Sequence, residues 1–230
     1  NSHSIAPLKT QRPFYPEGPQ VCHSVIVHTA GGMVGGDRLS LDLSVPDSGH
    51  AVVTTAASSK AYKSNGQAVQ QAIKMTVGAG GCLEWLPQSL ILFNGAQYHQ
   101  SLHVDLAPGA TWIGWDISSL GRTVRGESFD QGLWRSRIEL WQNGMPLWID
   151  PQQIQGGSSV LSSSHGLNSC PVIGTFAFLG ASVSQDFMHQ ARQLWTDLSG
   201  GDNEQAQASL ASSTMSARVM SYTGIATIQS

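Results

Sequence analysis

Apolar and polar residues alternate with a period of two in three similar segments of the chain. The clearest segment is Leu39 to Val45, in which every second residue is apolar. Such alternation predicts a β-strand with one buried face. Each segment ends in a turn rich in Gly or Pro, and a second apolar stretch follows. The alternating segments are 39–45, 73–77 and 102–106, and the second stretches are 51–53, 82–85 and 111–115.

The three units recur at a nearly constant spacing. Val45, Val77 and Leu106 close the alternating segments and lie 32 and 29 residues apart. Strand pairs repeated at such a period are typical of stacked coils or a stacked sandwich. The alternative is an ordinary β protein, in which strands recur about every 8–12 residues without a repeat. We predict a mainly β fold of stacked strand pairs, β-helix-like or β-sandwich-like, with one or two helices near the C-terminal end.

Two further elements follow from local signals. Asn143-Gly144 lies between two strand-like stretches and supplies the positive φ values of a tight hairpin turn, so a hairpin is predicted over 137–149. Ser184 is a good N-cap before apolar residues at helical spacing, which predicts a helix over 185–198. The segment from 205 onwards could form a weaker helix that leads into a strand near Val219.

The composition narrows the classes of partner. Only 12% of the residues are charged and the net charge is −3, so no basic face for nucleic acid is expected. No apolar run approaches the roughly 20 residues that span a bilayer, and no membrane contact is expected. Three scattered cysteines form no disulfide framework, which favours a cytoplasmic protein. The abundance of Ser and Gln has two interpretations. One is that it reflects only the amino-acid usage of the species. The other is that it indicates a surface largely covered by partners, because burying an uncharged polar group costs less than burying a charge.

Several chemistries can be tested against the sequence. The Gly-rich segment 31–38 is not a phosphate loop, because no Lys-Ser or Lys-Thr pair follows it and Asp37 would repel a phosphate. No nucleophile elbow, CxxC or HExxH motif occurs, so neither a serine hydrolase nor a closed metal site is expected. Paired carboxylates for glycoside cleavage remain open. The candidates for that chemistry are Asp37, Glu84, Asp116 and Glu127.

A series of motifs in order along the chain resembles one family. The main motifs are 11–17, 28–39 and 83–88, supported by matches around Lys60 and around Asp116. Together they resemble the urease accessory protein UreD, also called UreH, over roughly 11–180. The chain departs from the family at 29–30, where the family usually has two prolines, and at both ends. The resemblance implies a single UreD-like domain over 1–230 that lacks the extreme N- and C-terminal segments of the family.

The resemblance also implies a function. Members of the family are not known as enzymes; they act with UreF and the GTPase UreG on the urease apoprotein and help insert nickel into its active site, through a polar tunnel. Nickel would therefore pass transiently, with no permanent cofactor. The alternative is a β-helical carbohydrate-active enzyme.

The resemblance points to particular residues. Asp37, Glu84 and Glu127 are acids within the matching motifs and are candidates for the nickel path, although each could instead be a loop cap or an ion-pair partner. Other matching residues are expected to be structural or to form interfaces. These are Arg12, Tyr15, His28, Gly31, Gly32, Gly36, Arg38, Lys60, Tyr62, Ser64, Trp85, Gln88 and Arg122.

Overall fold

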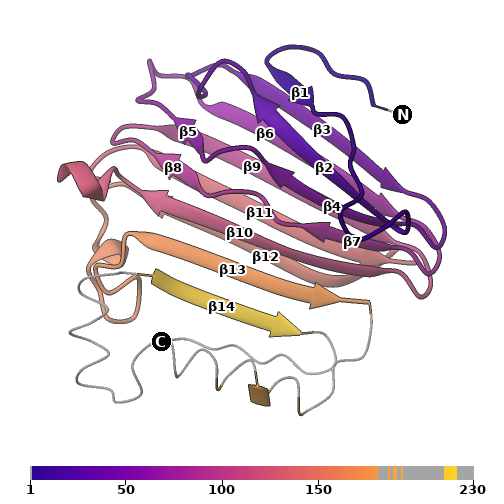
Figure 1. The fold of residues 1–230 in the computed structure, drawn as a ribbon. Helices are drawn as coiled ribbons and strands as arrows, with labels where there is room; N and C mark the ends of the chain where they lie inside the picture. Colours follow the sequence, from indigo (N-terminus) through magenta and orange to yellow (C-terminus); the bar gives the residue numbers. More distant parts are fainter. Residues whose placement is uncertain (1, 181–185, 187–188, 191–192, 194–214, 222–230) are drawn as a thin grey trace.

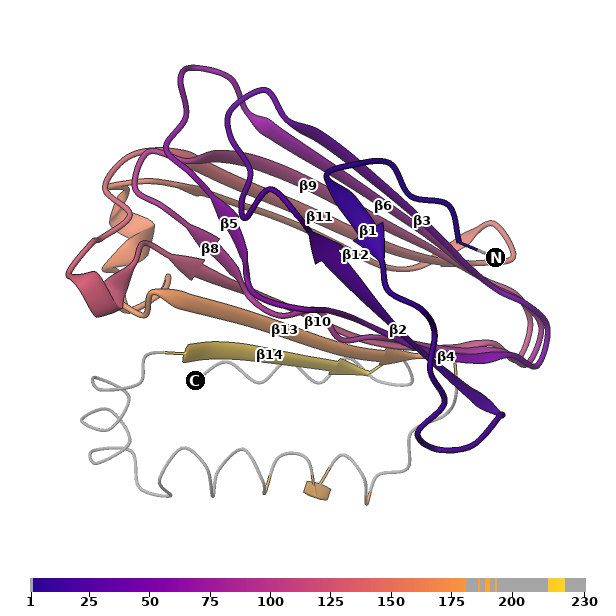
Figure 2. The same ribbon diagram turned by 45° about the horizontal axis from the view of Figure 1, so that its top comes forward.

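A computed structural model describes residues 2–180, 186, 189, 190, 193 and 215–221. In this part of the chain two β-sheets lie face to face (Figures 1 and 2). Sheet A has a main row of seven strands, in the spatial order β1 (Leu8–Thr10), β2 (Val21–His28), β4 (His50–Thr55), β7 (Cys82–Trp85), β10 (Thr111–Leu120), β13 (Val172–Leu179) and β14 (Met215–Ser221). Two short strands extend it: β8 (Leu90–Leu92) pairs with β10, and β5 (Ser59–Ala61) pairs with β8. Sheet B has the order β12 (Met145–Gln155), β11 (Leu133–Gln142), β9 (Gln97–Leu106), β6 (Val69–Val77) and β3 (Arg38–Val45).

The strands stack in parallel, and their register follows the repeat in the sequence. In sheet B, β3, β6, β9 and β11 are parallel neighbours, and in sheet A so are β2, β4, β7 and β10. Val45 pairs with Val77, and Val77 pairs with Leu106. The mainly β, stacked arrangement is therefore confirmed, and the predicted segments lie within β3, β6 and β9.

The corners between the two sheets stack as the strands do. The chain turns at 46–49, 78–81 and 107–110. The Ser48 N–H donates to the Ala79 carbonyl at 2.9 Å, so the ladder continues through the corner. Gly78 has no room for a side chain, since a Cβ there would lie 2.6 Å from the Asp47 backbone nitrogen. Glycine at this corner lets successive layers approach closely.

The parallel stack of sheet B ends in the expected hairpin. β11 and β12 pair antiparallel around Asn143 and Gly144, whose φ values are 51° and 73°. β12 contains Pro146 and Pro151, which an edge strand tolerates because its outer side needs no ladder donor. In sheet A, β13 turns back antiparallel to β10, and β14, which contains the strand expected near Val219, lies parallel to β13.

The C-terminal helix prediction cannot be compared in full. The expected helix over 185–198 and the weaker one from 205 lie outside the described residues, except for 186, 189, 190 and 193, which are helical. Two short 3-10 helices occur in the described part, η1 (Thr123–Arg125) and η2 (Ser159–Leu161). In that same part, no helix has the length and apolar character needed to cross a membrane.

Candidate functional site

Sheet A is interrupted halfway along its strands. Residues 56–58 separate β4 from β5, and 86–89 separate β7 from β8. Pro87 cannot donate a ladder hydrogen bond, which favours a break in strand pairing. The two breaks are joined by the Gln88 N–H, which donates to Thr55 Oγ1 at 2.9 Å. β10 passes the break uninterrupted and pairs with β7 before it and with β8 after it.

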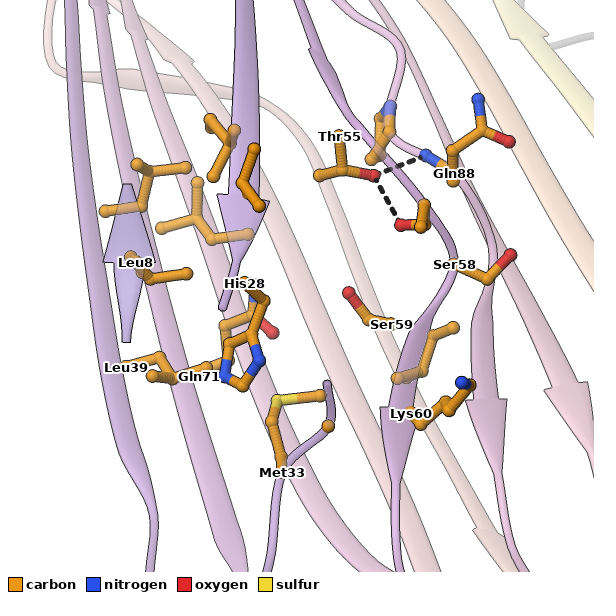
Figure 3. Close-up of a pocket in the computed structure, with 18 of the residues that line it drawn as sticks. Leu8, His28, Met33, Leu39, Thr55, Ser58, Ser59, Lys60, Gln71 and Gln88 are labelled. Carbon is orange, nitrogen blue, oxygen red and sulfur yellow. Dashed lines mark hydrogen bonds between the residues drawn. The ribbon is translucent and has the colours of Figure 1, made fainter. Parts of the chain in front are cut away.

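A cavity of about 190 Å³ lies behind this break. Figure 3 shows His28, Met33 and Gln71 on one side and Thr55, Ser58, Ser59 and Gln88 on the other. Ala56 and Ala57 line it and are exposed, so the cavity reaches the surface at the break. Its lining combines apolar side chains with several polar ones, and the polar groups allow a space of this size to hold water.

His28 is the unusual side chain of the cavity. It ends β2 on the inward face, and both ring nitrogens are buried with no hydrogen-bond partner among the described residues. A buried imidazole without partners is costly. Its two nitrogens are therefore available to water or to a passing ligand inside the cavity.

A layer of polar side chains crosses the sandwich at the level of the cavity. Gln71, Gln100, Ser136 and Gln152 are in register across four neighbouring strands of sheet B. Asp116 on β10 of sheet A faces them: Gln100 Nε2 donates to Asp116 Oδ2 at 2.6 Å, and Ser136 Oγ lies 3.5 Å from the same oxygen. We call these five residues the polar layer.

Burial changes the acidity of the groups in and beside this layer. Burial raises the pKa of Asp116, the nearby Asp150 carboxylate raises it further, and the hydrogen bonds from Gln100 and Ser136 oppose the shift. Asp116 keeps some accessible surface because it lines the cavity. Tyr98 is 1% exposed, and burial raises its pKa well above the ordinary value. Its hydroxyl therefore stays protonated and lies 2.6 Å from Gln71 Oε1.

The polar layer separates two apolar clusters. Each of three neighbouring strands has an apolar or aromatic residue on either side of its polar one, so on these strands the layer is a single polar level between apolar ones. Glutamine and serine at these positions do not follow from packing, because apolar side chains would fill the same space at lower cost. The inward sequences are Val69–Gln71–Ile73 on β6, Tyr98–Gln100–Leu102 on β9 and Trp134–Ser136–Ile138 on β11.

Many of the expected motif residues converge on the cavity. The Gly-rich segment 31–36 is held against β5, because the Met33 N–H donates to the Lys60 carbonyl at 2.7 Å. Gly31 and Gly36 have φ values of 74° and 96°, which explains why glycine is needed there. The motif residues that line the cavity are His28, Gly31, Gly32, Lys60, Trp85 and Gln88.

The other motif residues lie outside the cavity lining. Tyr62 packs edge-on against Phe93 at 4.8 Å between ring centroids, and the Arg122 guanidinium lies 4.2 Å from the centroid of the same ring. Ser64 bonds within its own loop, since its hydroxyl donates to the Gln67 carbonyl. Exposed positions at the surface are occupied by Arg12, Tyr15, Gly36 and Arg38.

The three candidate acids of the nickel path lie apart, and none of them lines the cavity as the described residues define it. Asp37 Oδ2 accepts the Val34 N–H at 2.8 Å, which is a turn cap. Glu84 pairs with His50, with 2.7 Å between Oε1 and Nε2. These two acids thus have the cap and the ion-pair partner that the alternative interpretation required, and a role for them in nickel transfer stays a prediction.

Glu127, the third acid, is tied to the loop after β10. Its carboxylate accepts hydrogen bonds from the Arg122 guanidinium and from the Asn94 N–H. These bonds, chiefly that from Arg122, lower its pKa to about 2. Glu127 is therefore ionised at all ordinary pH values and braces two loops against each other.

The sequence interpretation missed the residues of the polar layer apart from Asp116, which it considered for glycoside cleavage and as part of a motif match but not for the nickel path. A signal was present, because Gln71 and Gln100 are 29 residues apart, the spacing that pairs Val77 with Leu106. Ser136 and Gln152 follow a different spacing and lie outside the repeat.

Comparison with known proteins adds the family. The family model described as "UreD urease accessory protein" matches residues 1–228. A protein of Nostoc sp. named "Urease accessory protein UreD" is 54% identical over 193 residues, which cover 84% of this chain and 69% of that protein. Proteins with the same name from Acaryochloris marina and Synechocystis sp. are 49% and 40% identical, over 87% and 82% of this chain and 70% of each relative.

The chain belongs to the UreD family. The resemblance seen in the motifs is thereby confirmed, and the cavity residues can be considered as part of a UreD protein. The relatives are named as accessory proteins of urease.

Proposed function

We propose that this UreD-family chain is a non-enzymatic accessory protein that acts with UreF and the GTPase UreG on the urease apoprotein and helps insert nickel. In this proposal the cavity and the polar layer form an internal route for the ion. The observation that carries it is the row of polar side chains between two apolar clusters. Membership of the family supplies the link to urease.

The chemistry of the polar layer suits transient passage. Amide, hydroxyl and carboxylate oxygens hold Ni²⁺ less tightly than thiolates do. A hydrated dication also needs polar walls in an apolar interior, because each lost water must be replaced by another oxygen. Asp116 supplies a carboxylate to the layer, and His28 supplies two ring nitrogens to the cavity that have no partner among the described residues.

The arrangement of acids favours this proposal over glycoside cleavage. Such cleavage requires two carboxylates roughly 5–10 Å apart on either side of one sugar bond. The acids considered for that role have separate partners: Val34 for Asp37, His50 for Glu84 and Arg122 for Glu127. Asp116 points into the polar layer instead of onto an open groove.

The test is nickel-dependent activation of urease by complexes containing Gln71→Leu or Asp116→Asn. Gln71→Leu replaces an amide with an apolar group of similar size, and Tyr98 keeps Gln100 as a partner at 3.0 Å. Both variants are expected to form the complex with UreF and UreG and to activate urease several-fold less. Leu102→Met, two residues beyond Gln100 on the same face, is the matched control and should activate normally.

Two results would contradict the internal route. Full activation by both variants in complexes of verified composition would remove the polar layer from the path. Equal loss of activation with Leu102→Met would indicate that any change in this interior disturbs the fold. Thermal unfolding of each variant separates that second result from a specific effect on nickel transfer.

A further inference from the structure

A second group of ligand-type side chains lies on the outer face of sheet A. His50, Cys82 and Glu84 each present one ligand atom, and these atoms all lie within 4.8 Å of one another. His50 Nε2 and Glu84 Oε1 are 2.7 Å apart. Among the described residues, this is the one group of three His, Cys, Asp or Glu side chains whose ligand atoms are close enough to share a metal ion.

The pairing of β4 and β7 places these side chains together. His50 and Cys82 are direct cross-strand partners, and Glu84 is two residues further along β7 on the same face. Neighbouring strands of a sheet lie about 4.7–4.9 Å apart, so all three side chains can reach one point. The neighbouring residues Leu83 and Trp85 point inward into the apolar core, which fixes the outward direction of the cluster.

The backbone under the cluster is held firmly. His50 and Cys82 are the first residues after two stacked corners, and the Cys82 N–H donates to the Gly49 carbonyl at 2.8 Å. Both strands are therefore in position before any ligand arrives. His50 and Glu84 side chains are 34% and 26% exposed, so an ion can reach them from solvent.

We propose that His50, Cys82 and Glu84 form an open binding site for a late first-row divalent transition ion such as Ni²⁺. An imidazole nitrogen, a thiolate and a carboxylate are ligands that such ions share. On binding, the Cys82 thiol loses its proton to solvent, and the ion takes the place between His50 and Glu84 that a shared hydrogen now occupies.

The distances need little change. Ligand atoms about 2.0–2.3 Å from one tetrahedral ion lie roughly 3.3–3.8 Å from each other, so side-chain rotations suffice to bring the three atoms into place. Three protein ligands leave at least one position to water, as in sites that exchange or react with what they bind. The site lies on the opposite side of sheet A from the polar layer, so its existence does not depend on the internal route.

The test is titration of the purified chain with Co²⁺, followed by absorption, and with Ni²⁺, followed by calorimetry. The wild type is expected to show a thiolate-to-metal charge-transfer band that Cys82→Ser abolishes. His50→Gln and Glu84→Gln should weaken the affinity about tenfold or more, because even outer-shell changes cost that much.

Matched controls come from the same chain. A variant with Cys22→Ser and Cys170→Ser keeps Cys82 and should retain the band. His23→Gln removes another histidine paired with a carboxylate, Glu17 at 2.6 Å, and should bind as the wild type does.

Specific results would overturn the site. They are absence of the band in the wild type, its persistence in Cys82→Ser, or its loss when Cys22 and Cys170 are changed. If Cys82→Ser does not fold, Glu84→Gln decides the matter, because an unchanged affinity there contradicts the site. These measurements contain no urease, so their failure is distinct from failure of the internal route.

Discussion

Two carboxylates of this UreD-family chain lie in opposite surroundings. Asp116 is enclosed between the sheets, where burial raises its pKa. Glu127 accepts hydrogen bonds from Arg122 and from a backbone N–H, and its pKa falls to about 2. The two carboxylates should therefore make opposite contributions to the pH dependence of the free energy of unfolding.

Asp116→Asn should gain stability relative to the wild type as the pH rises. A raised folded-state pKa means that the wild type loses free energy of unfolding between the ordinary carboxyl pKa of about 4 and the higher folded value. The asparagine variant carries no such ionisation. Thermal unfolding of both proteins at a series of pH values measures the difference, and a difference independent of pH would contradict burial of the charge.

Glu127→Gln should show the reverse trend. The wild-type carboxylate stabilises the fold above its unfolded pKa of 4.5, and this contribution is lost as the pH falls toward 2. The variant is expected to be less stable at neutral pH and to approach the wild type in acid. The effect should be modest, because the Arg122 and Glu127 side chains are 38% and 22% exposed. Denaturant unfolding across that interval tests the prediction, and an equal loss at every pH would contradict it.

At the scale of elements, the stacked corners can be tested through glycine. Gly78→Ala should lower the free energy of unfolding by about 1–3 kcal/mol, because its Cβ would meet the Asp47 backbone and force two layers apart. Gly80→Asn in the same corner is the control: φ is 62°, the nearest atom to a Cβ there is 3.8 Å away, and asparagine tolerates this conformation. Denaturant unfolding should separate the two variants. Equal stability would indicate that the corners are not close-packed.

The elements show what the sequence could predict and what it could not. Alternation predicted the strands because the inward residues of β3, β6 and β9 are nearly all apolar. The spacing of the repeat also predicts which residues pair across neighbouring strands. His50 pairs with Cys82 and Val45 pairs with Val77, and the residues of each pair are 32 positions apart. The cavity could not be predicted in this way, because it depends on contacts at the break in sheet A, such as that between Gln88 in a loop and Thr55 at the end of β4.

At the scale of the whole molecule, the surface is weakly charged and partly apolar. Val124 is fully exposed at η1, Met145 is 68% exposed at the hairpin and Tyr15 is 53% exposed near the N-terminal end of the chain. With 12% charged residues there is little repulsion between copies. Because uncharged groups cost less to desolvate than charged ones, such a surface can be covered by partners or by other copies of the chain at little cost.

The isolated chain is therefore expected to self-associate, and UreF is expected to reduce this. Sedimentation velocity over a range of concentrations measures it. Added salt should not dissolve the associated species, because salt screens charges and does not weaken apolar contacts. A monodisperse chain at high concentration would contradict this prediction.

The order of the strands has a consequence for how the chain folds. β3, β6, β9 and β11 are added to their sheet in the order in which a ribosome makes them. Successive layers close loops of 32, 29 and 36 residues, and loop-closure entropy depends so weakly on length that each step costs nearly the same. The sheet can thus form one layer at a time during synthesis. At every stage the last strand exposes unpaired backbone groups to which the next parallel strand can add, until the β11–β12 hairpin ends the parallel stack of sheet B.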